Sequence, residues 1–437
     1  MANLASLPTE LMEGVAYNLG SGDVLNLRET CRAAAAGTFR LFQGYLFTTR
    51  LVMLERQSMQ NLIEISRHPV LRKAVKEVEL CVHHLIEPEV YKRLASTGDN
   101  DAEESYKESW KDMTDPSSRK MNIMRLAEAL SQLPNCKTVG VGNRRQPWGA
   151  VRLARRIGVF SDQSKSESPA LRQQVLHERT QSKIHALFCI RAIVSAICWK
   201  RIAVKKMYIT FGASLRDAAC AIPLMLVLPP SLEHAAKQQF TSITTLSILL
   251  RPNMRDEDIR QSRQLHTNDP ARQRPRSWLA DLQGFLDVFT SLSNLSIAVT
   301  LFTGYDLPAS LYRHMRVRHL QVLNLTDFIC TADQLLLMLR NHKSTLSKLV
   351  LTSLSLVNGK PALWISVVRA LCDDFHLEDL NLSGCIGCVH DWEYDVPNIC
   401  NCGQCDDDPQ ENSRSITEAV VAWEKELEKS YEKQQVV

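Results

Sequence analysis

The sequence lacks the local motifs of the best-known catalytic sites. It contains no G-x-S-x-G nucleophile elbow, no phosphate-binding G-x-x-x-x-G-K-[ST] loop and no H-E-x-x-H helix. The pair Gly359-Lys360 has no preceding glycine at the spacing that a phosphate loop requires. None of the 13 cysteines stands in a local nucleophile signature. The sequence therefore predicts a protein that is not an enzyme.

Long apolar runs are also absent. The most apolar stretch, residues 184–199, is interrupted by Arg191 and is too short to span a bilayer. The first residues carry no basic cluster ahead of an apolar core, so no secretory signal is expected. Without such a signal, the odd count of 13 cysteines indicates reduced thiols rather than a disulfide framework. We expect a soluble protein of the cytoplasm, the nucleus or both, with no membrane partner.

The charge is nearly balanced, with 52 basic and 48 acidic residues and a net charge of +4. A protein that coats nucleic acid is usually far more basic, so nucleic acid is not an expected partner. An arginine-rich segment at 251–278 could attract RNA or an import receptor, but acidic residues are interspersed in it. A solvated loop is the favoured interpretation of that segment.

The first 50 residues indicate a small helical module. Apolar residues at spacings of four fall on one face of a short helix: Leu7, Leu11, Val15 and Leu19. Pro8 fits its first turn, and Gly20 to Gly22 stop it, so that Asp23 can cap a second helix. A third helix is expected near Cys31. Such a module is either a docking surface for a partner or a cap on the rest of the chain.

The order of these residues resembles the F-box family. The matching elements are Leu7-Pro8-x-Glu10-Leu11, Val15 and Leu19, Asp23 with Leu25 and Leu27, and Cys31-Arg32. The resemblance implies binding to the linker subunit of an SCF-type ubiquitin ligase and, through it, to cullin. By position, the residues that contact this partner or form the module core are Leu7, Pro8, Leu11, Val15, Leu19, Leu25, Leu27 and Cys31. Residues up to 82 also resemble fungal F-box proteins with a leucine-rich region.

An L-x-x-L-x-L pattern recurs along the body of the chain and is typical of the strands of leucine-rich repeats. The clearest copies begin at Leu320, Leu346 and Leu377. Degenerate copies begin at Val75, Cys136, Val204, Ile243 and Leu292. Apolar residues at helical spacing lie between them. The expected fold class is α/β, with a three-helix F-box followed by an irregular solenoid of one strand and one helix per repeat. The alternative is another kind of α/β protein with the same alternation.

These patterns predict five segments. Residues 1–50 form the box, residues 51–72 a helical linker, and residues 73–390 the repeat-like domain. Insertions near 96–119, 143–183 and 252–276 interrupt the repeats and are expected to be disordered or substrate-specific loops. A Cys-rich acidic loop at 391–414 precedes an amphipathic helix at 415–437. That helix either covers the last repeat or docks another protein.

The sharpest cluster of possible ligands is Cys385-x-x-Cys388-x-His390 followed by Cys400-x-Cys402-x-x-Cys405. Thiolates and an imidazole at such spacing can close a tetrahedral structural zinc site. The alternative is that Cys385 belongs to the core of its repeat and the remainder forms a mobile acidic loop. No other cofactor is expected.

The function that these features predict is that of a substrate-recognition adaptor. The box would hold the ligase, and the repeats would bind a protein substrate whose identity the sequence does not specify. Two other functions remain open. One is an interaction scaffold outside ubiquitination, and the other is a regulator that depends on zinc or nucleic acid.

Overall fold

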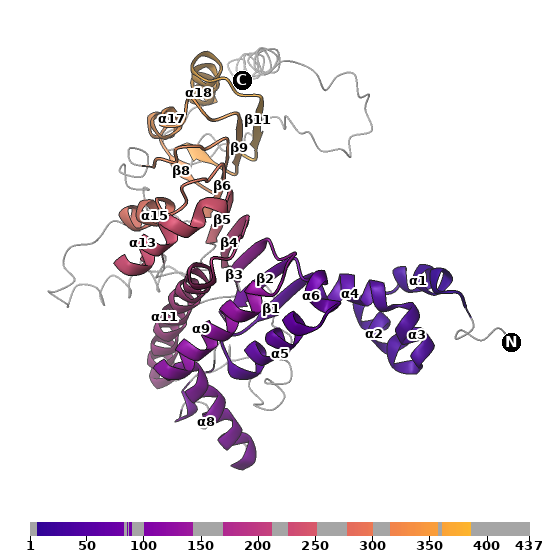
Figure 1. The fold of residues 1–437 in the computed structure, drawn as a ribbon. Helices are drawn as coiled ribbons and strands as arrows, with labels where there is room; N and C mark the ends of the chain where they lie inside the picture. Colours follow the sequence, from indigo (N-terminus) through magenta and orange to yellow (C-terminus); the bar gives the residue numbers. More distant parts are fainter. Residues whose placement is uncertain are drawn as a thin grey trace. The chain divides into compact units, whose positions relative to one another are not determined.

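The computed structural model describes residues 7–82, 85, 87–89, 100–142, 169–211, 226–250, 278–299, 315–356 and 361–385. The chain divides into two compact units, Met1–Lys205 and Lys206–Val437. Each unit contains parallel strands with helices between them in the sequence (Figure 1). The fold is therefore mixed α/β, as the sequence predicts.

Four short helices begin the first unit: α1 (Thr9–Tyr17), α2 (Ser21–Thr30), α3 (Arg32–Gly37) and α4 (Phe39–Phe47). Pro8 stands immediately before α1. An N–H at this position would have no acceptor within the helix, so its absence in proline costs no hydrogen bond. The N-cap of α2 is Gly20 and not Asp23, which lies in the first turn. A carboxylate in the first turn still interacts favourably with the positive end of the helix dipole. The start of the third helix at Arg32 agrees with the sequence.

In the part of the first unit that the structure describes, three parallel strands follow: β1 (Thr49–Val52), β2 (Glu77–Cys81) and β3 (Thr138–Gly142). The helices α5 (Arg56–Arg67), α9 (Pro116–Ser131) and α11 (Pro169–Lys200) lie side by side next to them (Figure 1). The segment 51–72, expected to be a helical linker, starts within β1 and reaches α6 (Leu71–Ala74). Strand β1 is only 4 residues long, too short for its alternation to stand out in the sequence.

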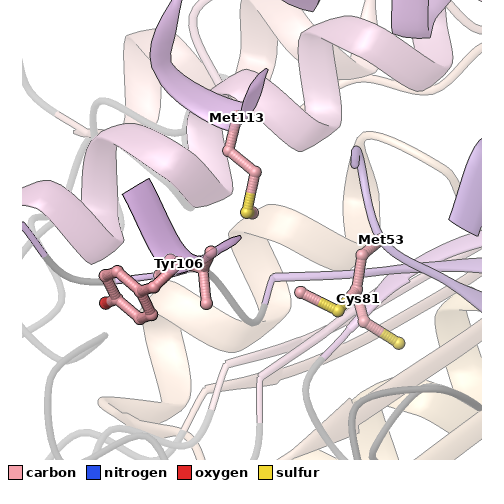
Figure 2. Close-up of a cluster of buried hydrophobic side chains, with 5 residues drawn as sticks. Met53, Cys81, Tyr106 and Met113 are labelled. Atoms are coloured by element: carbon pink, nitrogen blue, oxygen red, sulfur yellow. The ribbon is translucent and has the colours of Figure 1, made fainter. Parts of the chain in front are cut away.

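The charged segment 96–119, expected to be a loop, is instead helical over α8 (Asn100–Thr114) and the start of α9. Tyr106 and Met113 of α8 are buried in one cluster with Met53, Cys81 and Leu85 (Figure 2). An apolar side on a mostly polar helix explains why it packs against the unit. The expected insertion 143–183 likewise enters helix α11 at Pro169, and residues 252–276 lie outside the described residues.

The described residues of the second unit include six parallel strands: β4 (Lys206–Phe211), β5 (Thr245–Leu250), β6 (Asn294–Val299), β7 (Val322–Thr326), β9 (Lys348–Thr352) and β11 (Asp379–Ser383). Between them come α13 (Pro230–Gln239), α15 (Trp278–Leu286), α17 (Ala332–Arg340) and α18 (Pro361–Asp374). A second, short pair consists of β8 (Ile329–Cys330) and β10 (Ser355–Leu356). Every strand that the L-x-x-L-x-L copies predict is confirmed.

The apolar positions of those copies align from strand to strand in the second unit. The first column pairs Met207, Leu246, Leu295, Leu323, Leu349 and Leu380. The second column pairs Ile209, Ile248, Ile297, Leu325, Leu351 and Leu382. All twelve side chains are buried. Because each strand places alternate residues on one face, the columns form the core of this unit.

A buried histidine joins α17 to the chain that precedes β7. The side chain of His342 is 1% exposed, and its Nε2 accepts a hydrogen bond from the N–H of Val317 at 3.0 Å. Its Nδ1 lies 3.2 Å from the carbonyl oxygen of Met338, so the neutral ring with its proton on Nδ1 satisfies both contacts. Burial lowers the pKa of His342 below its usual 6.5, and the Met338 hydrogen bond opposes this shift more weakly.

Acid is expected to destabilise the second unit through His342. Because its folded-state pKa lies below the unfolded value, the unfolded chain binds the proton first as the pH falls through about 6.5. The contribution to stability is therefore complete above that pH and declines below it. Thermal unfolding measured between pH 7.5 and pH 5 should show a shallower pH dependence for His342→Gln than for the wild type. The exposed His319→Gln variant is the control, and an equal slope in all three proteins would contradict the prediction.

Candidate functional site

The two sides of helix α1 differ sharply in exposure. Met12 and Ala16 are buried at 1% and 0%, whereas Leu11 and Val15 are 58% and 47% exposed. The helix is therefore held by one side and presents apolar side chains on the other. Of the remaining predicted residues near this helix, Pro8 is exposed, and Leu7 and Leu19 are half-buried.

Small residues in α3 let α1 approach closely. A Cβ added at Gly37 would lie 3.0 Å from Cγ of Met12, which is tighter than an ordinary contact. Ala34 of the same helix has no exposed surface. Close packing of this kind leaves little room for a larger side chain. The side of α1 that carries Met12 is thus fixed, and Leu11 and Val15, each one residue before a buried one, stay exposed beside it.

Arg28 of α2 connects three of the four helices. Its Nη1 donates hydrogen bonds to the carbonyl oxygen of Ala35 and, at 3.3 Å, to Oγ1 of Thr38. The guanidinium carbon lies 3.9 Å from the ring centroid of Phe42, a cation–π geometry. Burial lowers the pKa of this guanidinium. Arg28 is not among the residues predicted from the sequence, although an arginine ahead of two phenylalanines at helical spacing, Phe39 and Phe42, is a signal for such a contact.

The predicted residues of α2 and α3 take different places. Leu25 and Leu27 are half-buried, while Val24, which is not among the residues carried over from the F-box pattern, is buried at 1%. Cys31 is exposed and caps α3, because its Sγ accepts a hydrogen bond from the N–H of Ala34 at 3.4 Å. That hydrogen bond lowers the pKa of the Cys31 thiol. Cys31 therefore acts as a helix cap and is not a core residue.

Two tyrosines add to the exposed apolar surface of the module. Tyr17 at the end of α1 is 71% exposed, and Tyr45 in α4 is 44% exposed. Aromatic side chains with an exposed ring and a polar tip are frequent in protein interfaces. The F-box pattern did not include either position. Their exposure in a folded helix is the observation that identifies them.

The structure describes one residue of the predicted zinc cluster. Cys385 is buried at 0%, and its thiol donates a hydrogen bond to the carbonyl oxygen of Leu351 at 3.5 Å. Burial raises its pKa to about 11, which keeps the thiol protonated and favours the core interpretation of this cysteine. Cys388, His390, Cys400, Cys402 and Cys405 lie outside the described residues, as do the arginine-rich segment 251–277 and the helix expected at 415–437.

Comparisons with known proteins give no assignment. Neither models of protein families nor the sequences of curated proteins match the chain. The F-box resemblance therefore stays a prediction. Within the described parts of the chain, no helix has both the length and the apolar composition needed to cross a membrane.

Proposed function

We propose that the protein is a substrate-recognition adaptor of an SCF-type cullin–RING ubiquitin ligase, acting in the cytoplasm, the nucleus or both. The observation that supports this proposal most directly is the exposed pair Leu11 and Val15 on a helix whose other side is packed. Apolar side chains held outward on a rigid element suit the apolar groove of a linker subunit. The order Leu7-Pro8 to Cys31-Arg32 is the resemblance that names this partner.

The second unit offers a surface for a protein substrate. On β7, β9 and β11 the residues between the buried columns are half-buried, and the parallel register aligns Asn324, Val350 and Asn381. Ser296 of β6 aligns with Asn324 on the same side. The row contains hydroxyl and amide groups that can pair with a polar partner, and Oδ1 of Asn324 is buried with no hydrogen-bond partner among the described residues. The side chains of this row carry no charge, so shape and hydrogen bonds would determine which substrate binds.

The proposed mechanism is proximity. An adaptor that holds a substrate beside a charged conjugating enzyme raises its effective concentration and contributes no chemistry of its own. No catalytic residue is required in this chain for that role.

Binding of the full chain to its proposed partners tests the function. The purified protein should bind a recombinant linker subunit directly and should retain cullin only when the linker subunit is present. Absence of linker binding would contradict the proposal. Linker binding without cullin recruitment would instead indicate a scaffold that acts outside ubiquitination.

A further inference from the structure

A groove in the first unit runs between α9 and α11 and has no role in the proposed docking to the ligase. Its volume is about 540 Å³, which lies in the range of ligand sites. The lining residues that characterise it are Arg119, Lys120, Ile123, Met124, Phe188 and Trp199. Two helices thus combine apolar and cationic side chains in one surface depression.

The apolar part of the groove is incompletely covered. Ile123, Met124 and Phe188 are half-buried, and the indole side chain of Trp199 is 50% exposed. Helix α11 otherwise buries most of the described side chains from His185 to Ile197. A half-exposed tryptophan beside a flexible methionine can adapt to an apolar side chain from outside.

Arg119 is held in place and still has donors to offer. Its Nε donates to the carbonyl oxygen of Met113 at 2.7 Å, and its guanidinium carbon lies 4.6 Å from the ring centroid of Phe188. Among the described residues, its Nη atoms have no hydrogen-bond partner. A planar guanidinium that is fixed at one end and free at the other is well suited to bind a carboxylate.

The groove carries positive charge that the described part of the chain does not neutralise. Lys120 lines it, and Nζ of Lys200 lies 5.5 Å from the ring centroid of Trp199. No carboxylate of the described residues pairs with Arg119, Lys120 or Lys200. The acidic residues closest in sequence are engaged elsewhere, since Asp112 accepts the N–H of Arg56 and Asp115 the N–H of Ser118.

We propose that this groove binds a short acidic segment of a substrate protein. A bulky apolar side chain of the segment would lie between α9 and α11 on Met124 and Trp199, and a flanking carboxylate would meet Arg119 and Lys120. The charge of the groove selects an acidic partner, and its half-exposed tryptophan suits an extended chain better than an enclosed small molecule. That the bound protein is a ubiquitination substrate rests on the proposed function, whereas the binding itself does not.

The probe is a fluorescein-labelled peptide, Glu-Glu-Leu-Phe-Glu-Glu, titrated with the full chain and followed by fluorescence anisotropy. Saturable binding is expected, and it should weaken as salt is added because part of the attraction is between exposed charges. Lys120→Glu and Trp199→Ala should each weaken binding by about tenfold, which corresponds to about 1.4 kcal/mol. Both side chains are exposed, so the variants should fold. Lys76→Glu, another exposed lysine of this unit that does not line the groove, is the matched control and should bind as the wild type does.

Two further peptides decide which chemistry the groove recognises. Gln-Gln-Leu-Phe-Gln-Gln and Glu-Glu-Ala-Ala-Glu-Glu should both bind at least about tenfold more weakly than the probe, because each lacks one half of the contact. Equal binding of the three peptides, or equal binding by Lys120→Glu and wild type, would overturn the proposal. Binding of dodecanoate without any peptide binding would also overturn it and would assign the groove to a small amphiphilic acid.

Linker-subunit binding by the same proteins separates this proposal from the proposed function. Lys120→Glu and Trp199→Ala should retain the linker subunit at wild-type affinity. If the chain binds the peptide but no linker subunit, the result supports the groove proposal and contradicts the proposed ligase function. If it binds the linker subunit but no peptide, only the groove proposal fails.

Discussion

Leu11→Asp is expected to lower the affinity of the full chain for the linker subunit by at least about 100-fold. Removing a leucine from an apolar contact costs about 1.5–3 kcal/mol, and placing an unpaired carboxylate there adds a desolvation penalty. Together these terms exceed the roughly 2.8 kcal/mol that a 100-fold change requires. Since Leu11 is 58% exposed, the substitution should leave the module folded. Val15→Asp should act in the same direction.

The matched control is Leu337→Asp in α17, because Leu337 is also a helical leucine and is 40% exposed. Both substitutions introduce the same charge and the same loss of helix propensity. Affinity is best measured by titration calorimetry, with circular dichroism to verify that each variant is folded. Leu337→Asp should bind the linker subunit normally. Wild-type affinity of Leu11→Asp would show that α1 is not the docking helix.

The strands of this fold were predictable because their pattern is local. Alternating apolar residues such as Leu349 and Leu351 point to one face of a strand wherever the strand lies in the chain. The helices at α17 and α18 were predictable for the same reason, since apolar residues recur there at helical spacing. The exposed face of α1 was predicted only in part. The spacing predicts that Leu11 and Val15 lie on one side of a helix, but it does not show which side of that helix packs inward.

Contacts between distant residues account for most of what the sequence did not show. Asp112 in the charged segment accepts a hydrogen bond from the N–H of Arg56, and Asn122 donates to the same carboxylate at 3.3 Å. These polar contacts, together with the burial of Tyr106 and Met113, hold α8 in a helix where composition suggested a loop. The groove depends similarly on two helices that approach one another only in the folded unit.

Leu349→Ala is expected to destabilise the second unit by about 2–5 kcal/mol, the usual cost of truncating a buried leucine. Leu349 has no exposed surface, and in the register of the strands it stands between Leu323 and Leu380. The vacated space has buried neighbours on both sides, so it cannot be refilled by water at low cost. Amide hydrogen exchange of β9 should accelerate by at least about 25-fold, which corresponds to the lower end of this range.

Val350→Ala is the matched control, because Val350 lies next to Leu349 in β9 but is half-buried on the other side of the strand. Its effect should stay below about 1 kcal/mol, since less apolar surface is lost. The pattern of exchange carries a second result. In a parallel sheet each strand is held by the strands that pair with it, so weakening one strand also weakens its neighbours. The amide hydrogens of β7 and β11 should therefore also exchange faster in Leu349→Ala. Faster exchange confined to β9 would show that the leucine column does not act as one cooperative core.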